Sequence, residues 1–212
     1  MQIFNFVENI KLYSENLFIL ISYVLVFNLI NWIFLGSILN IFGIYPRKLL
    51  GSPGIVAAPI LHGNFQHFVS NAIPFYWLSL LMIAIAGELD YYVILCIIGL
   101  ISGLLIWLFA RRAIHIGASA LITGMYSWLV CYTIYEPSLL NGIILGILFL
   151  YFGFIVIGIL PEESHVSWEG HLLGLIAGMM TYYYLYDLMN YYEEILIGIT
   201  EIKIWMMRHM MF

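Results

Sequence analysis

The nine residues Gly170–Gly178 read GHLLGLIAG, a histidine and three glycines in a run that is otherwise apolar. His171, Gly174 and Gly178 fall at positions i, i+3 and i+7, so they share one face of a helix. Glycines on such a face let a neighbouring helix approach closely, as in small-xxx-small packing. The stretch predicts a membrane helix that holds an imidazole close to another helix. An interfacial histidine above an ordinary packing seam would give the same pattern.

The composition of the chain is that of a membrane protein. Of its 212 residues, 64% are hydrophobic and 9% are charged, and the mean hydropathy is +1.01. Soluble domains carry about 25% charged residues. The net charge is -5 and the seven Lys and Arg are scattered, which argues against nucleic-acid binding. Cys96 and Cys131 lie in apolar runs, where buried thiols are expected instead of a disulfide or a metal site.

Charged residues divide the chain into six apolar runs, each near the roughly 20 residues of a spanning helix. We expect spans at Leu17–Tyr45, Phe65–Ala86, Tyr91–Ala110, Ser119–Tyr135, Leu139–Leu160 and His171–Met189. Residues 46–63 hold three of the six prolines and predict a long irregular loop, or a partly inserted one. The result is an all-α membrane protein with an N-terminal cytoplasmic segment (1–16), a six-helix domain (17–189) and an amphipathic tail along the interface (190–212).

Helix parity brings the unusual polar residues together. The second, fourth and sixth spans all enter from one side of the membrane, and His67, Asn71, Ser119 and His171 lie near their starts. Polar groups within a span are costly and usually face the bundle interior or a water-filled cavity. We therefore expect these four side chains at a similar depth near one membrane face.

Ser119 follows Gly117 in the stretch HIGASALITG, at a predicted junction between a loop and a helix. A serine hydroxyl is a weak nucleophile until a base takes its proton. The start of a helix offers free backbone N–H groups that can stabilise an oxyanion. The alternative is a serine that caps the helix or allows close packing.

His67 and Asn71 are four residues apart, on one face of the second span, and both side chains can donate to an oxyanion. A metal site is the alternative, because His62, His67 and His171 are expected on one side. Zinc hydrolases typically place two histidines at i and i+4 with a glutamate between them. His62 and His67 are five apart with no carboxylate between them. We therefore expect neither a metal nor another cofactor.

Three stretches together resemble the rhomboid intramembrane serine proteases. They are APILHGNFQHFVSNAIP (58–74), HIGAS (115–119) and SWEGHLLGLIAG (167–178), in the family's order. The resemblance implies a six-helix rhomboid-like bundle in which Ser119 is the nucleophile and His171 the general base. It also implies an oxyanion hole of His67, Asn71 and the Ser119 backbone N–H, and close helix packing at Gly117, Gly174 and Gly178.

Two positions depart from the family pattern. Ala120 follows the serine where the family usually has glycine, and Thr123 stands where the family often has an aromatic ring beneath the histidine. We expect these departures to affect rate more than identity, and Tyr126, one turn further, is a candidate substitute for the missing ring.

The orientation of the chain is predicted differently by charge and by resemblance. Four basic residues on the active-site side against three on the other weakly favour a cytoplasmic active site. The resemblance implies the opposite, and we follow it. We expect a multi-pass protein of a bacterial inner membrane, in contact with membrane lipids, whose substrates are transmembrane proteins cut near the outer face. Substrate identity, oligomeric state and regulation are not predicted.

Two other functions compete with proteolysis. A proteolytically inactive relative could bind membrane proteins through the same fold, although Ser119 and His171 are both present. A small transporter is disfavoured, because the polar residues cluster near one face and the sequence shows no inverted repeat.

Overall fold

The computed structural model describes residues 2–153, 155 and 168–185, with side chains from Tyr13 onward. Apart from one isolated bridge between Ile44 and His115, the regular structure of these residues is helical. The long helices are α1 (Gln2–Ile33), α3 (Phe65–Ala86), α4 (Glu88–Phe109), α5 (Ser119–Tyr135) and α6 (Leu139–Phe152). Residues 168–185 form a further helix. The all-α prediction is therefore confirmed for this part of the chain.

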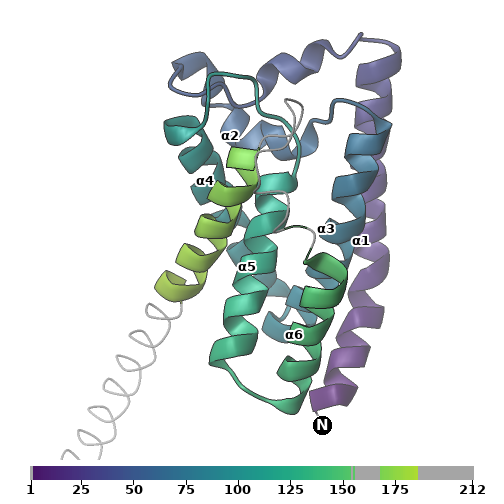
Figure 1. Ribbon diagram of the computed structural model, residues 1–212. Coiled ribbons are helices and arrows are strands. Elements are labelled where there is room, and N and C mark those ends of the chain that lie inside the picture. The colour runs from purple at the N-terminus through teal and green to yellow at the C-terminus, as the bar shows by residue number, and fades with distance from the viewer. Residues whose placement is uncertain (1, 154, 156–167, 186–212) are drawn as a thin grey trace, which may run out of the picture.

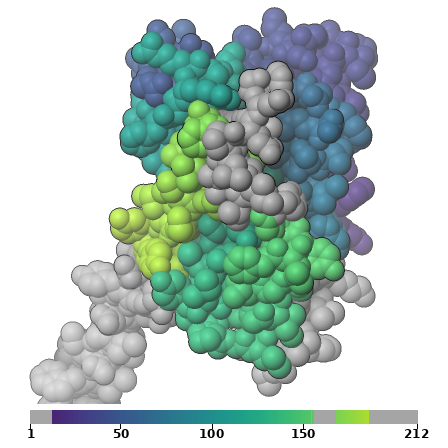
Figure 2. Space-filling view, in the orientation of Figure 1, coloured from purple at the N-terminus to yellow at the C-terminus, as the bar shows by residue number. Residues whose placement is uncertain are grey.

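The helices form a bundle in which α5 is central (Figure 1). It packs against α3, α4 and α6, while α1 packs along α3. Most side chains of α5 are buried, and its sequence is apolar on every side. Both features are expected for a helix that is surrounded by other helices. In space filling, the helix of residues 168–185 lies on the surface, with its first turn below the segment that joins α4 to α5 (Figure 2).

Three helices of the described chain are long and apolar enough to cross a membrane, at Tyr13–Ile33, Phe65–Ala86 and Glu88–Phe109. Their outward side chains are large and apolar, for example Phe18 and Tyr23 on α1. The protein is therefore an integral membrane protein. The prediction of six spans remains a prediction for the other three, and residues 190–212 lie outside the described part of the chain.

The prediction for the end of the first span is wrong. It placed the helix through Tyr45, but α1 ends at Ile33. The chain turns at Gly36 and Ser37, which have φ of 58° and 65°. The Asn31 side chain accepts a hydrogen bond from the Leu39 backbone N–H (3.1 Å), so a residue within the helix fixes the turn that follows it. The apolar run continues past this turn as the 3₁₀ helix η1 (Ile38–Phe42).

The segment predicted as an irregular loop contains three short helices: η2 (Leu49–Gly51), α2 (Gly54–Ala57) and η3 (Ala58–Ile60). Together with the connection between α4 and α5, it lies at one end of the bundle, opposite the N-terminus (Figure 1). Leu49 and Leu50 are 85% and 97% exposed. The starts of α3, α5 and the helix of residues 168–185 face this same end, so the parity argument holds for the described helices.

Candidate active site

The first turn of α3 sets the position of His67. Asn64 is the N-cap residue, and its side-chain oxygen accepts a hydrogen bond from the His67 backbone N–H at 2.8 Å. This satisfies one of the free N–H groups at the helix start. Asn71 lies one turn further, and its Nδ2 donates to the His67 carbonyl at 2.8 Å. The two predicted oxyanion donors are thus bonded to each other through the backbone.

The tautomer of His67 follows from its hydrogen bond. The Gly63 backbone N–H donates to His67 Nδ1 at 3.4 Å, so Nδ1 is the acceptor nitrogen. In a neutral imidazole the proton is then on Nε2. This leaves the Nε2–H free to donate in another direction.

That direction is the segment leading into Ser119. Gly117 has φ of 104°, in the region that favours glycine. A Cβ built on Gly117 would lie 2.6 Å from His67 Nε2 and 3.6 Å from Asn71 Nδ2. Only a residue without a side chain therefore leaves the two donors room beside the backbone. The Gly117 N–H is held by the Ala58 carbonyl at 2.9 Å.

Ser119 is the first residue of α5 and is half-buried. The first hydrogen bond across the start of this helix runs from the Ile122 N–H to the Ala118 carbonyl, at 2.9 Å. The Ser119 N–H belongs to the first turn, where no preceding helical carbonyl is in place to accept it. The hydroxyl and a backbone donor of the same residue therefore lie two residues after Gly117, whose Cβ position is 2.6 Å from His67 Nε2.

The helix of residues 168–185 meets α5 through Gly174 and Gly178, along a contact that we call the glycine seam. A Cβ on Gly174 would collide with the Ala120 carbonyl and the Thr123 hydroxyl, and a Cβ on Gly178 with the Gly124 carbonyl. The Ser127 hydroxyl also donates across the seam, to the Leu175 carbonyl at 2.8 Å. The two backbones are therefore in direct contact.

This contact places His171 at the level of Ser119. His171 is about one turn before Gly174, and Ser119 directly precedes Ala120, which Gly174 touches. His171 also lies close enough to His67 for the two rings to interact electrostatically. The structure thus brings His67, Asn71 and His171 into one region, with Ser119 at the level of His171, and it sets Gly117, Gly174 and Gly178 against their neighbours' backbone or donor atoms.

The departures at Ala120 and Thr123 lie within the seam. Ala120 is 8% exposed, and its carbonyl accepts a hydrogen bond from the Thr123 hydroxyl at 3.0 Å. Thr123 thus occupies the space beside Gly174 with a small side chain bonded to its own helix. Tyr126 is buried, and its hydroxyl has no hydrogen-bond partner among the described residues.

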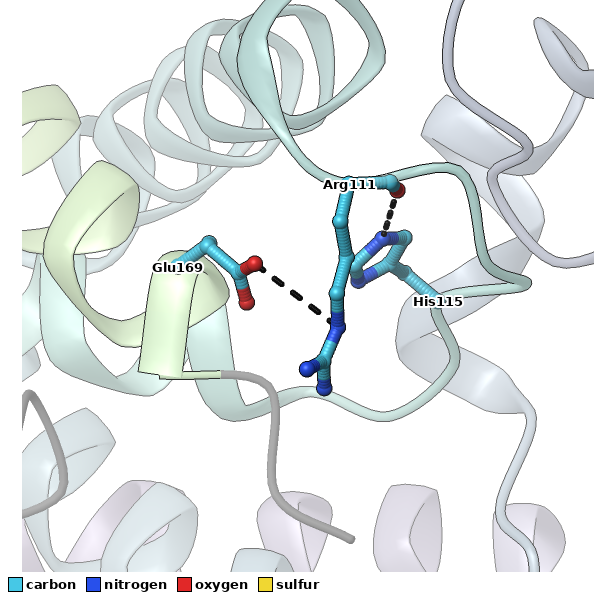
Figure 3. Close-up of polar contacts among 3 residues, drawn as sticks. All are labelled: Arg111, His115 and Glu169. Carbon is cyan, nitrogen blue, oxygen red and sulfur yellow. Dashed lines mark hydrogen bonds and ion pairs between the residues drawn. The ribbon is translucent and has the colours of Figure 1, made fainter. Parts of the chain in front are cut away.

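An ion pair joins the two chain segments that precede the candidate catalytic residues (Figure 3). Arg111, in the connection between α4 and α5, contacts Glu169 through Nε and Oε1 at 3.7 Å. The Arg111 carbonyl accepts a hydrogen bond from His115 Nε2 at 3.0 Å, and His115 pairs through its backbone with Ile44. Glu169 is two residues before His171 and only 15% exposed. This pair was not predicted from the sequence.

Two residues of α1 that the sequence analysis missed hold the chain before α3. The Asn28 side chain donates to the Ile60 carbonyl at 2.8 Å and accepts from the His62 N–H at 2.9 Å. Trp32 Nε1 donates to the His62 carbonyl at 2.8 Å. A usable signal was present, because an asparagine within an apolar span usually faces the protein interior.

The described residues offer no set of side chains for the alternative metal site. Within residues 2–153, 155 and 168–185, His, Cys, Asp and Glu form no group of three or more that could hold a metal ion. Cys96 and Cys131 are free thiols, Cys131 buried and Cys96 exposed on the bundle.

Comparison with known proteins gives the family. Residues 53–188 match the Rhomboid domain. An uncharacterized protein of Mycobacterium tuberculosis is 36% identical over 160 residues, which cover 71% of this chain and 66% of the relative. An uncharacterized protein of Mycobacterium leprae is 34% identical over 141 residues, which cover 62% and 55%. The chain thus spans less than two thirds of these relatives' length. No solved structure matches. The match covers most of the chain and contains all three motifs, which shows that the chain belongs to the rhomboid family.

Proposed function

We propose that this protein is an intramembrane serine endopeptidase that cuts transmembrane segments by a Ser119–His171 dyad. The observation that carries the proposal is the convergence at one end of the bundle. Ser119 begins α5, His171 stands at the same level on the helix pressed against α5, and two side-chain donors flank Gly117. Family membership supports this chemistry.

In the proposed reaction, His171 takes the proton of the Ser119 hydroxyl while the oxygen attacks the scissile carbonyl. His67 Nε2–H, Asn71 Nδ2 and the Ser119 N–H donate to the oxyanion that forms. Preorganised donors of this kind are each worth about 10²–10³ in kcat. His171 then protonates the leaving amine, and water releases the acyl group from Ser119 in a second round of the same steps.

We further propose that the cut lies near the outer face of a bacterial inner membrane. In a regular helix the carbonyl is hydrogen-bonded and shielded, so the substrate must unwind locally. Glycine, proline and other weak helix formers in its outer part lower that cost. Ala120 adds a methyl group beside the nucleophile, which favours a small residue before the scissile bond.

A single-span model substrate, reconstituted with the protein in liposomes, tests this function. Mass spectrometry of the products should map the cut near the outer end of the span, after Ala, Ser, Gly or Cys. Replacing that residue with Phe should suppress cutting, and so should replacing downstream helix breakers with Leu. Cutting at the cytoplasmic end, or after bulky residues, would contradict the proposal. Capture of the substrate without any product would favour the inactive, binding relative.

A further inference from the structure

The link between η3 and α3 is hydrogen-bonded to side chains of α1. Asn28 is fully buried; its Nδ2 donates to the Ile60 carbonyl at 2.8 Å, and its Oδ1 accepts from the His62 N–H at 2.9 Å. Trp32, one turn further along α1, donates from Nε1 to the His62 carbonyl at 2.8 Å. Buried backbone polar groups need partners, and two side chains of the first span supply them here. Both backbone polar groups of His62 are therefore fixed to α1.

The His62 carbonyl and the Gly63 N–H belong to the same peptide group. This group is planar and trans, so its carbonyl and its N–H point in opposite directions. The bond from Trp32 to the carbonyl therefore sets the direction of the Gly63 N–H. That N–H donates to His67 Nδ1 at 3.4 Å, a long hydrogen bond that a small rotation of the peptide would break.

This hydrogen bond decides which nitrogen of His67 can donate. A neutral imidazole carries one N–H, and an acceptor at Nδ1 leaves the proton on Nε2. A Cβ at Gly117 would lie 2.6 Å from Nε2, so this nitrogen is beside the backbone that leads into Ser119. If the proton moved to Nδ1, Nε2 would offer a lone pair there and would repel an oxyanion. The orientation of one loop peptide thus matters for the proposed oxyanion hole.

We propose that Asn28 and Trp32 are positioning residues for the proposed proteolysis. They hold the peptide between residues 62 and 63 so that its N–H occupies His67 Nδ1, which leaves the Nε2–H to donate to the oxyanion. This role rests on the proposed function, because His67 matters here as an oxyanion donor. The two residues act through the loop peptide and not on the substrate, so the state of His67 can be measured without a substrate.

Nitrogen NMR on the full chain in nanodiscs, with isotope-labelled histidine, tests the hold on His67. Long-range correlations identify the protonated nitrogen of each ring, and His67→Ala assigns the His67 signals. In the wild type, Nδ1 should be unprotonated and hydrogen-bonded. Trp32→Phe keeps an aromatic ring but removes the indole N–H, so the Nδ1 signal should shift toward that of a free acceptor nitrogen.

Trp107→Phe on α4 is the matched control for this change. Trp107 Nε1 also donates to a loop carbonyl, that of Lys48, at 3.0 Å. The variant therefore removes the same kind of hydrogen bond from a peptide that does not contact His67. It should leave the His67 signals and the cleavage rate as they are.

Cleavage of the model substrate in liposomes tests the catalytic consequence. Trp32→Phe should lower kcat about fivefold with KM unchanged, the effect of one hydrogen bond. In the His67→Ala background Trp32→Phe should have no further effect, because residues that act through one another are not additive. A merely structural role would instead multiply the two losses. Asn28→Ala should act in the same direction, and it replaces Trp32→Phe if circular dichroism and gel filtration show that Trp32→Phe does not fold.

A wild-type His67 with its proton on Nδ1 would overturn the role of both residues, whatever the variants do. An unchanged Nδ1 signal in a folded Trp32→Phe would overturn it too, and so would losses that multiply in the double variant. A wild type that cuts no substrate would contradict the proposed function and this role with it. The NMR result distinguishes that failure from a loop that does not hold His67.

Discussion

The two sides of α5 are packed in opposite ways. On one side, the helix of residues 168–185 leaves no room for a methyl group at Gly174 or Gly178. On the other, a cavity of about 160 Å³ separates the start of α5 from α1. The tight side is where two candidate catalytic residues come from different helices and must be held at a fixed separation. The loose side is lined by Asn71 and His62 among apolar residues, and neither member of the proposed dyad lines it. Close packing is thus found where the proposed reaction needs a fixed distance between Ser119 and His171.

The largest effect should come from removing the dyad that the tight side holds. Ser119→Ala or His171→Ala should lower the cleavage rate by a factor on the order of 10³ or more, since a nucleophile and its base act as a unit. Rates on a model substrate in liposomes measure this. Ser52→Ala, a half-buried serine of the loop before α3, is the control and should cut normally. Wild-type cleavage by Ser119→Ala, with other proteases excluded, would rule out the serine mechanism.

The next effect comes from opening the seam itself. Gly174→Val should displace the helix that carries His171, and a shift of about 1 Å at a catalytic contact can cost on the order of a hundredfold in rate. A hundredfold in rate is about 2.7 kcal/mol of activation free energy, and overpacking commonly costs a similar amount in stability, about 1–3 kcal/mol. Thermal unfolding and cleavage rates of the same preparation separate the two effects.

Gly146→Val on α6 is the matched control for the seam. A Cβ at Gly146 has nothing within 4 Å, so this variant makes the same change in open space. It should retain nearly full activity. Equal losses in Gly174→Val and Gly146→Val would remove the argument from close packing.

His62, on the loose side, should make the stability of the protein depend on pH. The pKa of His62 is lowered from 6.5 to about 4, so the folded protein binds fewer protons than the unfolded chain between these values. Stability from this group is complete above pH 6.5 and is lost as pH falls toward 4, by about 2–3 kcal/mol. His62→Phe should flatten this part of the curve of unfolding temperature against pH. An unchanged slope in His62→Phe would show that His62 is not the responsible group.

The smallest effect should come from the ion pair beside the seam. Arg111 is 45% exposed, and exposed pairs contribute about 0–1 kcal/mol. Arg111→Gln should lower kcat a few-fold with little change in KM, because it loosens the segment before His171 without touching the substrate. Arg112→Gln, a change in the neighbouring exposed arginine, should leave kcat as it is. Partial recovery in the charge-swapped pair Arg111→Glu with Glu169→Arg would show that the pairing matters.

The elements predicted accurately are those whose ends carry local signals. The structure has α3 and α5 at the predicted bounds, because Asn64 caps one and Gly117 leads into the other. The end of α1 was missed because the run INWIFLGSILNIF stays apolar through the turn. That turn depends on the Asn31 side chain reaching forward to Leu39, which hydropathy does not report.

In the candidate site, too, some residues were predicted from the sequence and others were missed. His67, Asn71, Ser119 and His171 were found because polar residues stand out in apolar spans. Glu169 was missed because its partner is 58 residues away and an isolated carboxylate near a helix start has many possible roles. The cavity could not be predicted either, because it depends on how the side chains of α1, α3 and α5 pack against one another. The sequence reveals which polar residues lie in apolar spans, but their partners depend on contacts between segments that are distant in the sequence.

The most direct test of the central claim is a reaction with a fluorophosphonate probe, followed by mass spectrometry of the labelled peptide. If the seam makes Ser119 nucleophilic through His171, the adduct should map to Ser119 in the wild type. It should fall to background in His171→Ala and fall strongly in Gly174→Val, while Gly146→Val labels normally. An adduct on another serine, or labelling of Ser119 that persists without His171, would contradict the account.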